Sequence, residues 1–247
     1  MRKKLTLLFL FGIGVMCIHA QQTKINWQVN AFKATSFVEN RGQFENLKGK
    51  AYNDIRYSAR LNGGYLFFTP SGLAWRYASS EKSEQEHKRR LLGKSKNTGE
   101  EFKSVVHETR MEWIGASSNP EIIASDKTAD YHTFGVSKNG QQSIRAEAYK
   151  KLTYKNLYPG IDLVYKFHPK DGIKYELIVN PGADASKIRM RYKGEAELHK
   201  DEKGNLNIVT GAGTITDHAP VTFYDEATTT KKGIASAFWI FNENEVG

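Results

Sequence analysis

Apolar and polar residues alternate with a period of two over most of the chain, which is the pattern of β-strands whose successive side chains face opposite sides of a sheet. A three-stranded meander appears first, at Ile55–Leu61, Tyr65–Thr69 and Leu73–Tyr77. Its corners are Asn62-Gly63-Gly64 and Pro70-Ser71-Gly72, and these residue types predict turns.

The clearest unit is a hairpin between Ile161–Phe167 and Ile173–Val179, where apolar residues occupy every second position of both runs. Pro169-Lys170-Asp171-Gly172 joins them, with proline presetting φ and glycine accepting the left-handed conformation of the turn. A second hairpin is predicted between Ala196–His199 and Leu206–Val209.

Further strands are predicted at Val105–Ile114, Tyr131–Val136, Ile188–Tyr192, Val221–Phe223 and Ala237–Phe241, and Asn139-Gly140 predicts another tight turn. A strong helical period is absent. The pattern therefore predicts an all-β fold of antiparallel sheets, a β-sandwich-like arrangement built of hairpins and meanders.

The run Ala237–Phe241 is apolar on both faces, which is typical of a central buried strand. The chain ends six residues after this run, at Gly247. We interpret the sequence as a fragment of a longer protein, or as a domain whose closing strands are missing.

The strand pattern is interrupted at residues 79–102, which are polar and charged. The basic run His87–Arg90 lies there among glutamates, so we interpret the segment as a solvated excursion between strands rather than a nucleic-acid contact. Residues 37–247 then form one all-β domain, or two β subdomains at 37–150 and 151–247.

The N-terminus has the organisation of a signal peptide. Residues 2–4 are basic, Leu5–Ile18 is apolar, and Ala20 supplies the small residue at a cleavage point. Because the apolar run is too short to span a bilayer of about 30 Å, we expect no transmembrane anchor after cleavage. We predict a signal peptide at 1–20, a lead segment at 21–36, and export to the periplasm, cell surface or medium.

The only cysteine, Cys17, lies in the signal peptide, so the exported chain has no disulfide, catalytic thiol or cysteine-bound zinc. The net charge of +9 falls to +6 when the three cations of the signal peptide are removed. This modest charge allows weak attraction to anionic cell-surface polymers.

Catalytic motifs are absent: the sequence has no G-x-S-x-G, H-E-x-x-H or phosphate loop. The histidines beyond the signal peptide are scattered, at His87, His107, His132, His168, His199 and His218. Asp130 and Asp217 each lie beside a histidine in sequence, but the simpler interpretation is ordinary surface residues. Asp162, at the start of a strand, is interpreted as a carboxylate that caps a turn. We predict no catalytic residue, cofactor or metal.

The chain has 12 tyrosines, 13 phenylalanines and 4 tryptophans, which could build a platform for sugars. Trp75, Trp113 and Trp239 fall on the apolar phase of strands and are expected in the core. Trp27 lies in a polar stretch and is the one tryptophan not assigned to the core.

Three segments resemble a known family. Phe37–Gln43 reads F-V-E-N-R-G-Q, Tyr154–Tyr165 contains Y-P-G-I-D, and Lys174–Asp184 ends in P-G-A-D. Together they resemble an uncharacterised N-terminal domain of secreted bacterial proteins that carry β-propeller (SBBP-type) repeats. The resemblance implies large exported or cell-surface proteins, often linked to type IX secretion or gliding-associated sorting domains. This chain ends without such repeats or a sorting domain.

The family has no assigned catalytic residues, so the resemblance implies structural roles for the motif. These residues are Asn40, Gly42, Gln43, Tyr158, Pro159, Gly160, Asp162, Pro181, Gly182 and Asp184. We expect Gly160 and Gly182 to permit turns that Pro159 and Pro181 fix.

The leading hypothesis is an exported, non-enzymatic β domain that serves as a structural, assembly or adhesion module. Its partners would be cell-surface polymers, glycans or other surface proteins, with no nucleic acid. A carbohydrate-binding module is the second hypothesis, and it requires exposed aromatic side chains. A polysaccharide or peptide hydrolase is the third, and it requires carboxylates or Asp–His neighbours that converge in a cleft.

Overall fold

The computed structural model describes residues 36–44, 47, 54–61, 64–80, 104–135, 143–168, 172–194, 196–224 and 232–247. The predicted signal peptide, nearly all of the lead segment, most of the polar segment 79–102 and the Asn139-Gly140 turn lie outside these residues. Within them the chain forms strands and one 3-10 turn, so the all-β prediction is confirmed.

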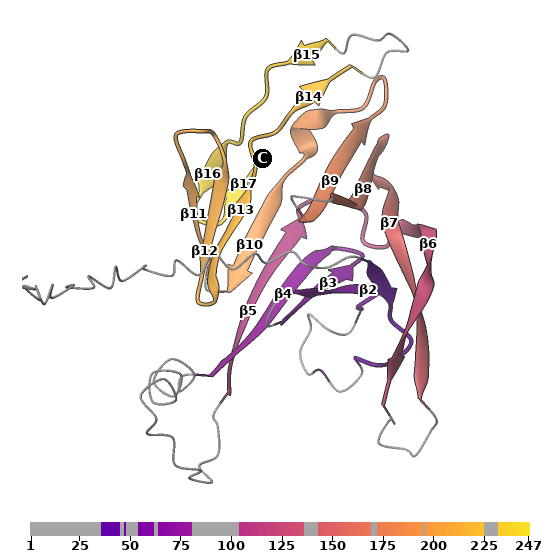
Figure 1. The fold of residues 1–247 in the computed structure, drawn as a ribbon. Helices are drawn as coiled ribbons and strands as arrows, with labels where there is room; N and C mark the ends of the chain where they lie inside the picture. The colour runs from indigo at the N-terminus through magenta and orange to yellow at the C-terminus, as the bar shows by residue number, and fades with distance from the viewer. Residues whose placement is uncertain are drawn as a thin grey trace, which may run out of the picture.

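Most strands belong to one antiparallel sheet with the order β16-β17-β10-β5-β4-β3-β2-β1-β7-β8-β9, and β6 pairs with β7 (Figure 1). The strands of the first half are β1 (Phe37–Glu39), β2 (Tyr57–Leu61), β3 (Gly64–Thr69), β4 (Gly72–Ser80), β5 (Ser104–Trp113) and β6 (Glu121–Phe134). The later strands are β7 (Ile144–Tyr158), β8 (Ile161–His168), β9 (Gly172–Val179), β10 (Met190–Gly194), β16 (Ile240–Asn242) and β17 (Glu245–Val246).

Two small antiparallel sheets complete the described fold. One contains β11 (Ala196–Lys200), β12 (Leu206–Thr210) and β13 (Gly213–Asp217), and the other contains β14 (Thr222–Phe223) and β15 (Gly233–Ile234). The 3-10 turn η1 (Ala185–Lys187) lies between β9 and β10.

The local pairings agree with the alternation in the sequence. The predicted meander is β2-β3-β4, in register through Leu66↔Trp75, and the two predicted hairpins are β8-β9 and β11-β12. The boundary considered at 150/151 falls inside β7, and the large sheet contains strands from both sides of it.

The large sheet curves so that strands far apart in its order face each other across one core. Trp113 on β5 donates a hydrogen bond to the Tyr165 hydroxyl on β8 (3.3 Å), and its ring packs edge-on against Tyr175 on β9. Phe68 on β3 contacts Tyr165 in the same way. This is the face-to-face packing of a β-sandwich made from one continuous sheet.

The three-stranded sheet closes the same core. It contributes the buried side chains of Leu206, Ile208 and Ile215. Its β13 ends at Asp217, whose carboxylate accepts a hydrogen bond from the Tyr175 hydroxyl (2.8 Å). The small sheet is therefore attached to the large one by apolar packing and by the hydrogen bond between Tyr175 and Asp217.

The C-terminal strand differs from its prediction. Trp75 and Trp113 are buried as expected, with 6% and 4% of their surface exposed, but Trp239 is 67% exposed and Phe241 44% exposed. Within the described residues β16 pairs only with β17, so it lies at an edge of the sheet. The prediction of a central buried strand was wrong because only the inner face, with Phe238, meets the core. Trp27 lies outside the described residues.

Candidate functional site

The first sequence motif folds into a turn held by its own side chains. The Asn40 side chain donates to the Ile55 carbonyl (2.8 Å) and accepts from the Gly42 N–H (3.0 Å). The Gln43 side chain donates to the Glu39 carbonyl (2.7 Å) and accepts from the Arg41 N–H (2.6 Å). Gly42 has φ of 98°, a conformation that favours glycine. The turn is thereby fixed at the end of β1 and tied to the segment before β2.

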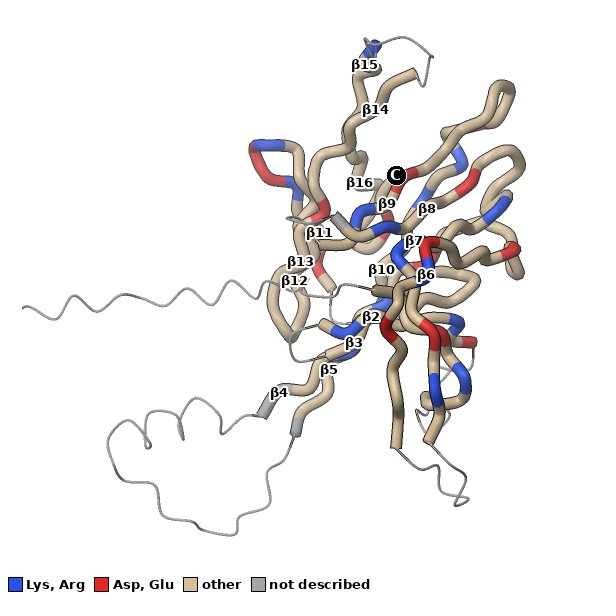
Figure 2. The backbone as a smooth tube through the Cα atoms, turned by 45° about the vertical axis from the view of Figure 1, so that its right-hand side comes forward, with Lys and Arg blue, Asp and Glu red and all other residues tan. Residues whose placement is uncertain are grey.

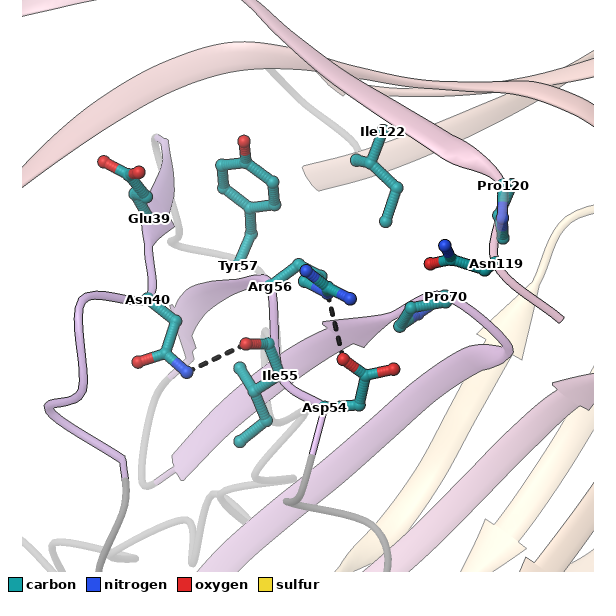
Figure 3. Close-up of a pocket in the computed structure, with 10 residues that line it drawn as sticks. All are labelled: Glu39, Asn40, Asp54, Ile55, Arg56, Tyr57, Pro70, Asn119, Pro120 and Ile122. Atoms are coloured by element: carbon teal, nitrogen blue, oxygen red, sulfur yellow. Dashed lines mark hydrogen bonds and ion pairs between the residues drawn. The ribbon is translucent and has the colours of Figure 1, made fainter.

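A cavity of about 410 Å³ lies beside this turn (Figure 3). Its size is in the range of roughly 300–1,000 Å³ that is typical of small-molecule sites. It is lined by Glu39, Asn40, Asp54, Ile55, Arg56, Tyr57, Pro70, Asn119, Pro120 and Ile122. These residues come from the motif turn, the start of β2, the β3-β4 turn, and the start of β6 with the two residues before it.

The charges in the cavity occur as pairs. Asp54 and Arg56 form an ion pair (3.0 Å), and Glu39 pairs with Arg41 (3.0 Å). The Arg56 guanidinium extends across the view of the cavity, between the Tyr57 ring and Asn119 (Figure 3). Burial raises the pKa of Tyr57, and the negative charge of Glu39 raises it further, so its hydroxyl is protonated at neutral pH. The lining therefore holds two carboxylates and one guanidinium, and Arg41, which is not part of the lining, balances the charge of Glu39.

The second motif shapes the β7-β8 connection. Pro159-Gly160 form the turn, and Gly160 has φ of 74°. Asp162 accepts a hydrogen bond from the Asn156 N–H (2.8 Å) and forms an ion pair with Lys155. Asn156, with φ of 49°, lies where the β7-β8 register shifts. Asp162 thus stabilises the backbone of a β-bulge. Partial burial raises the pKa of Asp162, but the hydrogen bonds that it accepts from Lys155 and Asn156 outweigh this and hold its pKa below the usual value.

The third motif packs directly on the second. The Asn180 N–H donates to the Gly160 carbonyl (3.0 Å), which brings the Pro181-Gly182 turn beside the Pro159-Gly160 turn. A Cβ atom on Gly160 would lie only 3.0 Å from the Ala183 Cβ. Asp184 then caps η1 by accepting from the Ser186 N–H (3.0 Å) and hydroxyl (2.6 Å). The structure brings the two proline–glycine turns together.

Tyr158 links this junction to the opposite wall of the cavity. Its hydroxyl contacts the carbonyl oxygens of Ile114 (3.1 Å) and Arg189 (3.3 Å). Nearby, the Ser117 N–H donates to the Leu157 carbonyl (2.8 Å). Both contacts anchor the chain that leads to Asn119 and Pro120, so the first and second motifs support different walls of one cavity.

Acid–base candidates do not converge in the described residues. His132 on β6, His199 on β11 and His218 after β13 are exposed and belong to different elements. His87 and the His168 side chain are outside the description. Asp217 is engaged by Tyr175, and burial raises its pKa to about 6. Across the described ranges, no three His, Cys, Asp or Glu side chains form a group suited to a metal ion.

The edge strand β16 forms a second accessible feature. Trp239 and Gly247 exchange two backbone hydrogen bonds (2.8 and 3.0 Å). Because such pairs alternate along antiparallel strands, the N–H and C=O of Ile240 face the outer edge. Arg189 lies over the Phe241 ring, 3.9 Å from its centroid. An aromatic pair and a sheet edge are thus exposed together.

Charged residues of both signs are interspersed along the described backbone (Figure 2). Many are paired across neighbouring strands, as Lys193 with Glu112 (2.7 Å) and Lys127 with Glu147 (2.8 Å). None of the helices among the described residues is long and apolar enough to cross a membrane.

Sequence reasoning did not select Asp54, Arg56 or Tyr57, because each is an ordinary residue at the start of a strand. Only the neighbouring motif at Asn40 marked the region. The exposed position of Trp239 was also missed, since its apolar neighbours predicted burial.

These observations define the class of protein as an antiparallel all-β domain with motif-built turns around a polar cavity. Residues 37–247 match the family model described as a domain of unknown function, DUF7948, and the chain belongs to this family. Searches of curated proteins and of solved structures find no match.

Proposed function

We propose that this chain is an exported, non-enzymatic β domain that serves as an assembly or adhesion module of a cell-surface or secreted protein. Its binding mode is the addition of an extended polypeptide strand of a partner protein to the outer edge of β16. The observation that carries the proposal is Trp239, which directly precedes this edge strand and has 67% of its surface exposed. The same proposal includes that this domain is part of a longer protein with SBBP-type repeats and a type IX sorting domain.

Two features of β16 favour a polypeptide strand as the partner. The outward N–H and C=O of Ile240 can pair with a strand backbone, and main-chain pairing supplies affinity in strand addition. Trp239, directly before β16, and Phe241, where the β16-β17 register shifts, are both exposed and available to side chains of an added strand. Tryptophan and arginine are enriched among residues that dominate binding energies, and Arg189 lies beside Phe241.

The gain from covering Trp239 is appreciable. A tryptophan with two thirds of its surface exposed offers on the order of 150 Å² of mostly apolar area, which corresponds to roughly 2–4 kcal/mol when buried. Part of this is lost to the ordering of the partner strand, so micromolar affinity is expected for a short peptide.

The non-enzymatic part of the proposal rests on how the carboxylates are used. Asp162 and Asp184 accept backbone N–H groups, and Asp217 accepts the Tyr175 hydroxyl. These groups support turns and the attachment of the small sheet. The histidines His132 and His218, which a hydrolase would bring together, lie on separate elements.

The test uses the exported chain, Gln21–Gly247, and a panel of seven-residue peptides with alternating valine and polar residues. Binding is followed by tryptophan fluorescence, because an exposed indole shifts to shorter wavelength when it is covered. We expect saturable binding by part of the panel. Peptides of the same sequence with alternate backbone nitrogens methylated should not bind, because they cannot complete the ladder.

Two variants distinguish pairing at the strand edge from nonspecific hydrophobic binding. Trp239→Lys should abolish binding, since an edge lysine opposes strand pairing. Val209→Lys is the matched control, because Val209 is an exposed apolar residue (39%) on β12, which has neighbours on both sides. Equal loss with both variants, or undiminished binding of the methylated peptides, would reject strand addition.

A further inference from the structure

The cavity beside Asn40 carries an inference that goes beyond strand addition, because it uses β1, β2 and the start of β6 rather than β16. Its walls are fixed before any ligand arrives. Asn40 is held by hydrogen bonds to Ile55 and Gly42, and its own N–H donates to the Arg56 carbonyl (2.9 Å). The Arg56 N–H in turn donates to the Phe68 carbonyl (2.8 Å). A site built on such a rigid frame loses little entropy on binding.

The β3-β4 turn that contributes Pro70 is also anchored. The buried Tyr154 hydroxyl on β7 donates to the Thr69 carbonyl (3.1 Å). The far wall at Asn119 and Pro120 follows the contacts made by Tyr158 and Leu157 described above. The backbone around the cavity is therefore held by hydrogen bonds, while the side chains of Asp54 and Arg56 pair with each other at its surface.

The balance of charge selects the ligand class. Asp54 is neutralised by Arg56, and Glu39 by Arg41. An anionic ligand would meet the two carboxylates, and a cationic ligand would meet a guanidinium, so neither gains a net attraction. A neutral ligand with several hydroxyl groups can donate to the carboxylates and accept from Arg56 and Asn119 at once.

The accessible lining is mostly polar, and a few carbon surfaces within it can meet the C–H face of a sugar ring. Pro70, Pro120 and Ile122 contribute aliphatic surface, and Tyr57 contributes an aromatic ring with a protonated hydroxyl. The Tyr57 ring is supported from the side by Tyr149, with centroids 6.2 Å apart. The Tyr57 ring thus gives a mostly polar cavity one aromatic surface on which an apolar face of a sugar can pack.

We propose that this cavity binds a neutral sugar residue of a glycan, with the Asp54–Arg56 pair and Tyr57 as its contacting groups. The carboxylate of Asp54 accepts from sugar hydroxyls, and the guanidinium of Arg56 donates to sugar oxygens. The Tyr57 ring covers an apolar face of the sugar.

The experiment is isothermal titration calorimetry of the exported chain, Gln21–Gly247, with neutral oligosaccharides of glucose, mannose, galactose and N-acetylglucosamine. Uronic acid oligomers are the charged comparison. We expect one-site binding to a neutral class that is unchanged between 0.15 and 0.5 M NaCl, since screening acts on net charge. Absence of binding by every neutral oligosaccharide overturns the proposal, and so does binding of uronic acids alone that vanishes at 0.5 M NaCl.

The double variant Asp54→Asn with Arg56→Gln keeps the net charge and leaves polar side chains at both positions. It should weaken sugar binding about tenfold to a hundredfold, the range expected for lost hydrogen bonds to charged groups. Lys127→Gln with Glu147→Gln is the matched control, because it removes an ion pair of similar length (2.8 Å) on β6 and β7. Equal affinities of the cavity variant and the control overturn the assignment.

Trp239→Lys separates this proposal from the previous one. It should abolish strand-peptide binding and leave sugar affinity unchanged. Loss of sugar binding in Trp239→Lys would move the sugar site to the exposed aromatic edge and reject the cavity.

Discussion

Replacing Asp217 by asparagine should stabilise the domain at neutral pH. The carboxyl group lies at the end of β13, where the three-stranded sheet meets Tyr175 on β9. Burial raises its pKa from the usual 3.8 to about 6, although the Tyr175 hydrogen bond and His218 oppose the rise. An ionised Asp217 is therefore unfavourable in the folded protein.

The sign and the pH window follow from linkage. The folded state binds the Asp217 proton more tightly than the unfolded state, so stability decreases as the pH rises from about 3.8 to about 6. Above this window the full penalty is present, and below it none remains. The pKa difference corresponds to at most about 3 kcal/mol. Because the side chain is partly exposed, we expect Asp217→Asn to gain roughly 1–2 kcal/mol at pH 7.5 and nothing at pH 3.5.

Urea unfolding at several pH values between 3.5 and 8, followed by circular dichroism, measures this difference. The asparagine oxygen can still accept from Tyr175, so the contact between the sheets is kept. Asp201→Asn is the matched control in the same small sheet. The Asp201 pKa is lowered by hydrogen bonds from Asn205 and Lys203, so its ionised form stabilises the fold and its replacement should reduce stability at neutral pH. If Asp217→Asn lowers stability at pH 7.5, the reasoning about burial is refuted.

Three further substitutions test other parts of the structure. Gly160→Ala should destabilise the domain more than Gly182→Ala. Both positions have positive φ, where an alanine costs about 1 kcal/mol or more, but only at Gly160 would the added Cβ lie 3.0 Å from the Ala183 Cβ. Equal thermal midpoints of the two variants would contradict this. Tyr158→Phe removes the hydroxyl proton that the Ile114 and Arg189 carbonyls share, although the Arg189 carbonyl keeps the Ile114 N–H. Chemical denaturation should show a loss of about 1–2 kcal/mol, whereas no loss would deny the contact a stabilising role. Trp239→Lys should change the free energy of unfolding by less than about 0.5 kcal/mol because the side chain is exposed; a large loss would place the indole in the core.

The motif residues were expected from sequence to form turns, and the structure adds how these turns contact each other. Pro159, Gly160, Pro181 and Gly182 lie in two turns that contact each other through the Asn180 N–H and the Gly160 carbonyl. From sequence, the residue types indicated turns, but the contact between turns 22 residues apart (159 to 181) could not be inferred. The bulge at Asn156, which Asp162 supports, was likewise invisible, because a register shift leaves no mark in the alternation of residues.

The pairing of neighbouring strands could be predicted from the order of residues alone. Alternation at Tyr57–Tyr77 and at Ile161–Val179, together with glycine and proline at the corners, specifies hairpins because the side-chain period and the turn conformation are local properties. The same reasoning placed Trp75 and Trp113 in the core, where both are buried.

Pairings between strands that are far apart in sequence depend on how the whole chain folds. β1 pairs with β7, and β10 pairs with both β5 and β17, although nothing in their residues specifies these partners. Those pairings decide that Trp239 lies on an outer edge and that Asp54, Arg56 and Asn119 share one cavity. Alternation of residues shows which side chains of a strand share a face. It does not show which elements pack on that face, because those elements come from distant parts of the sequence.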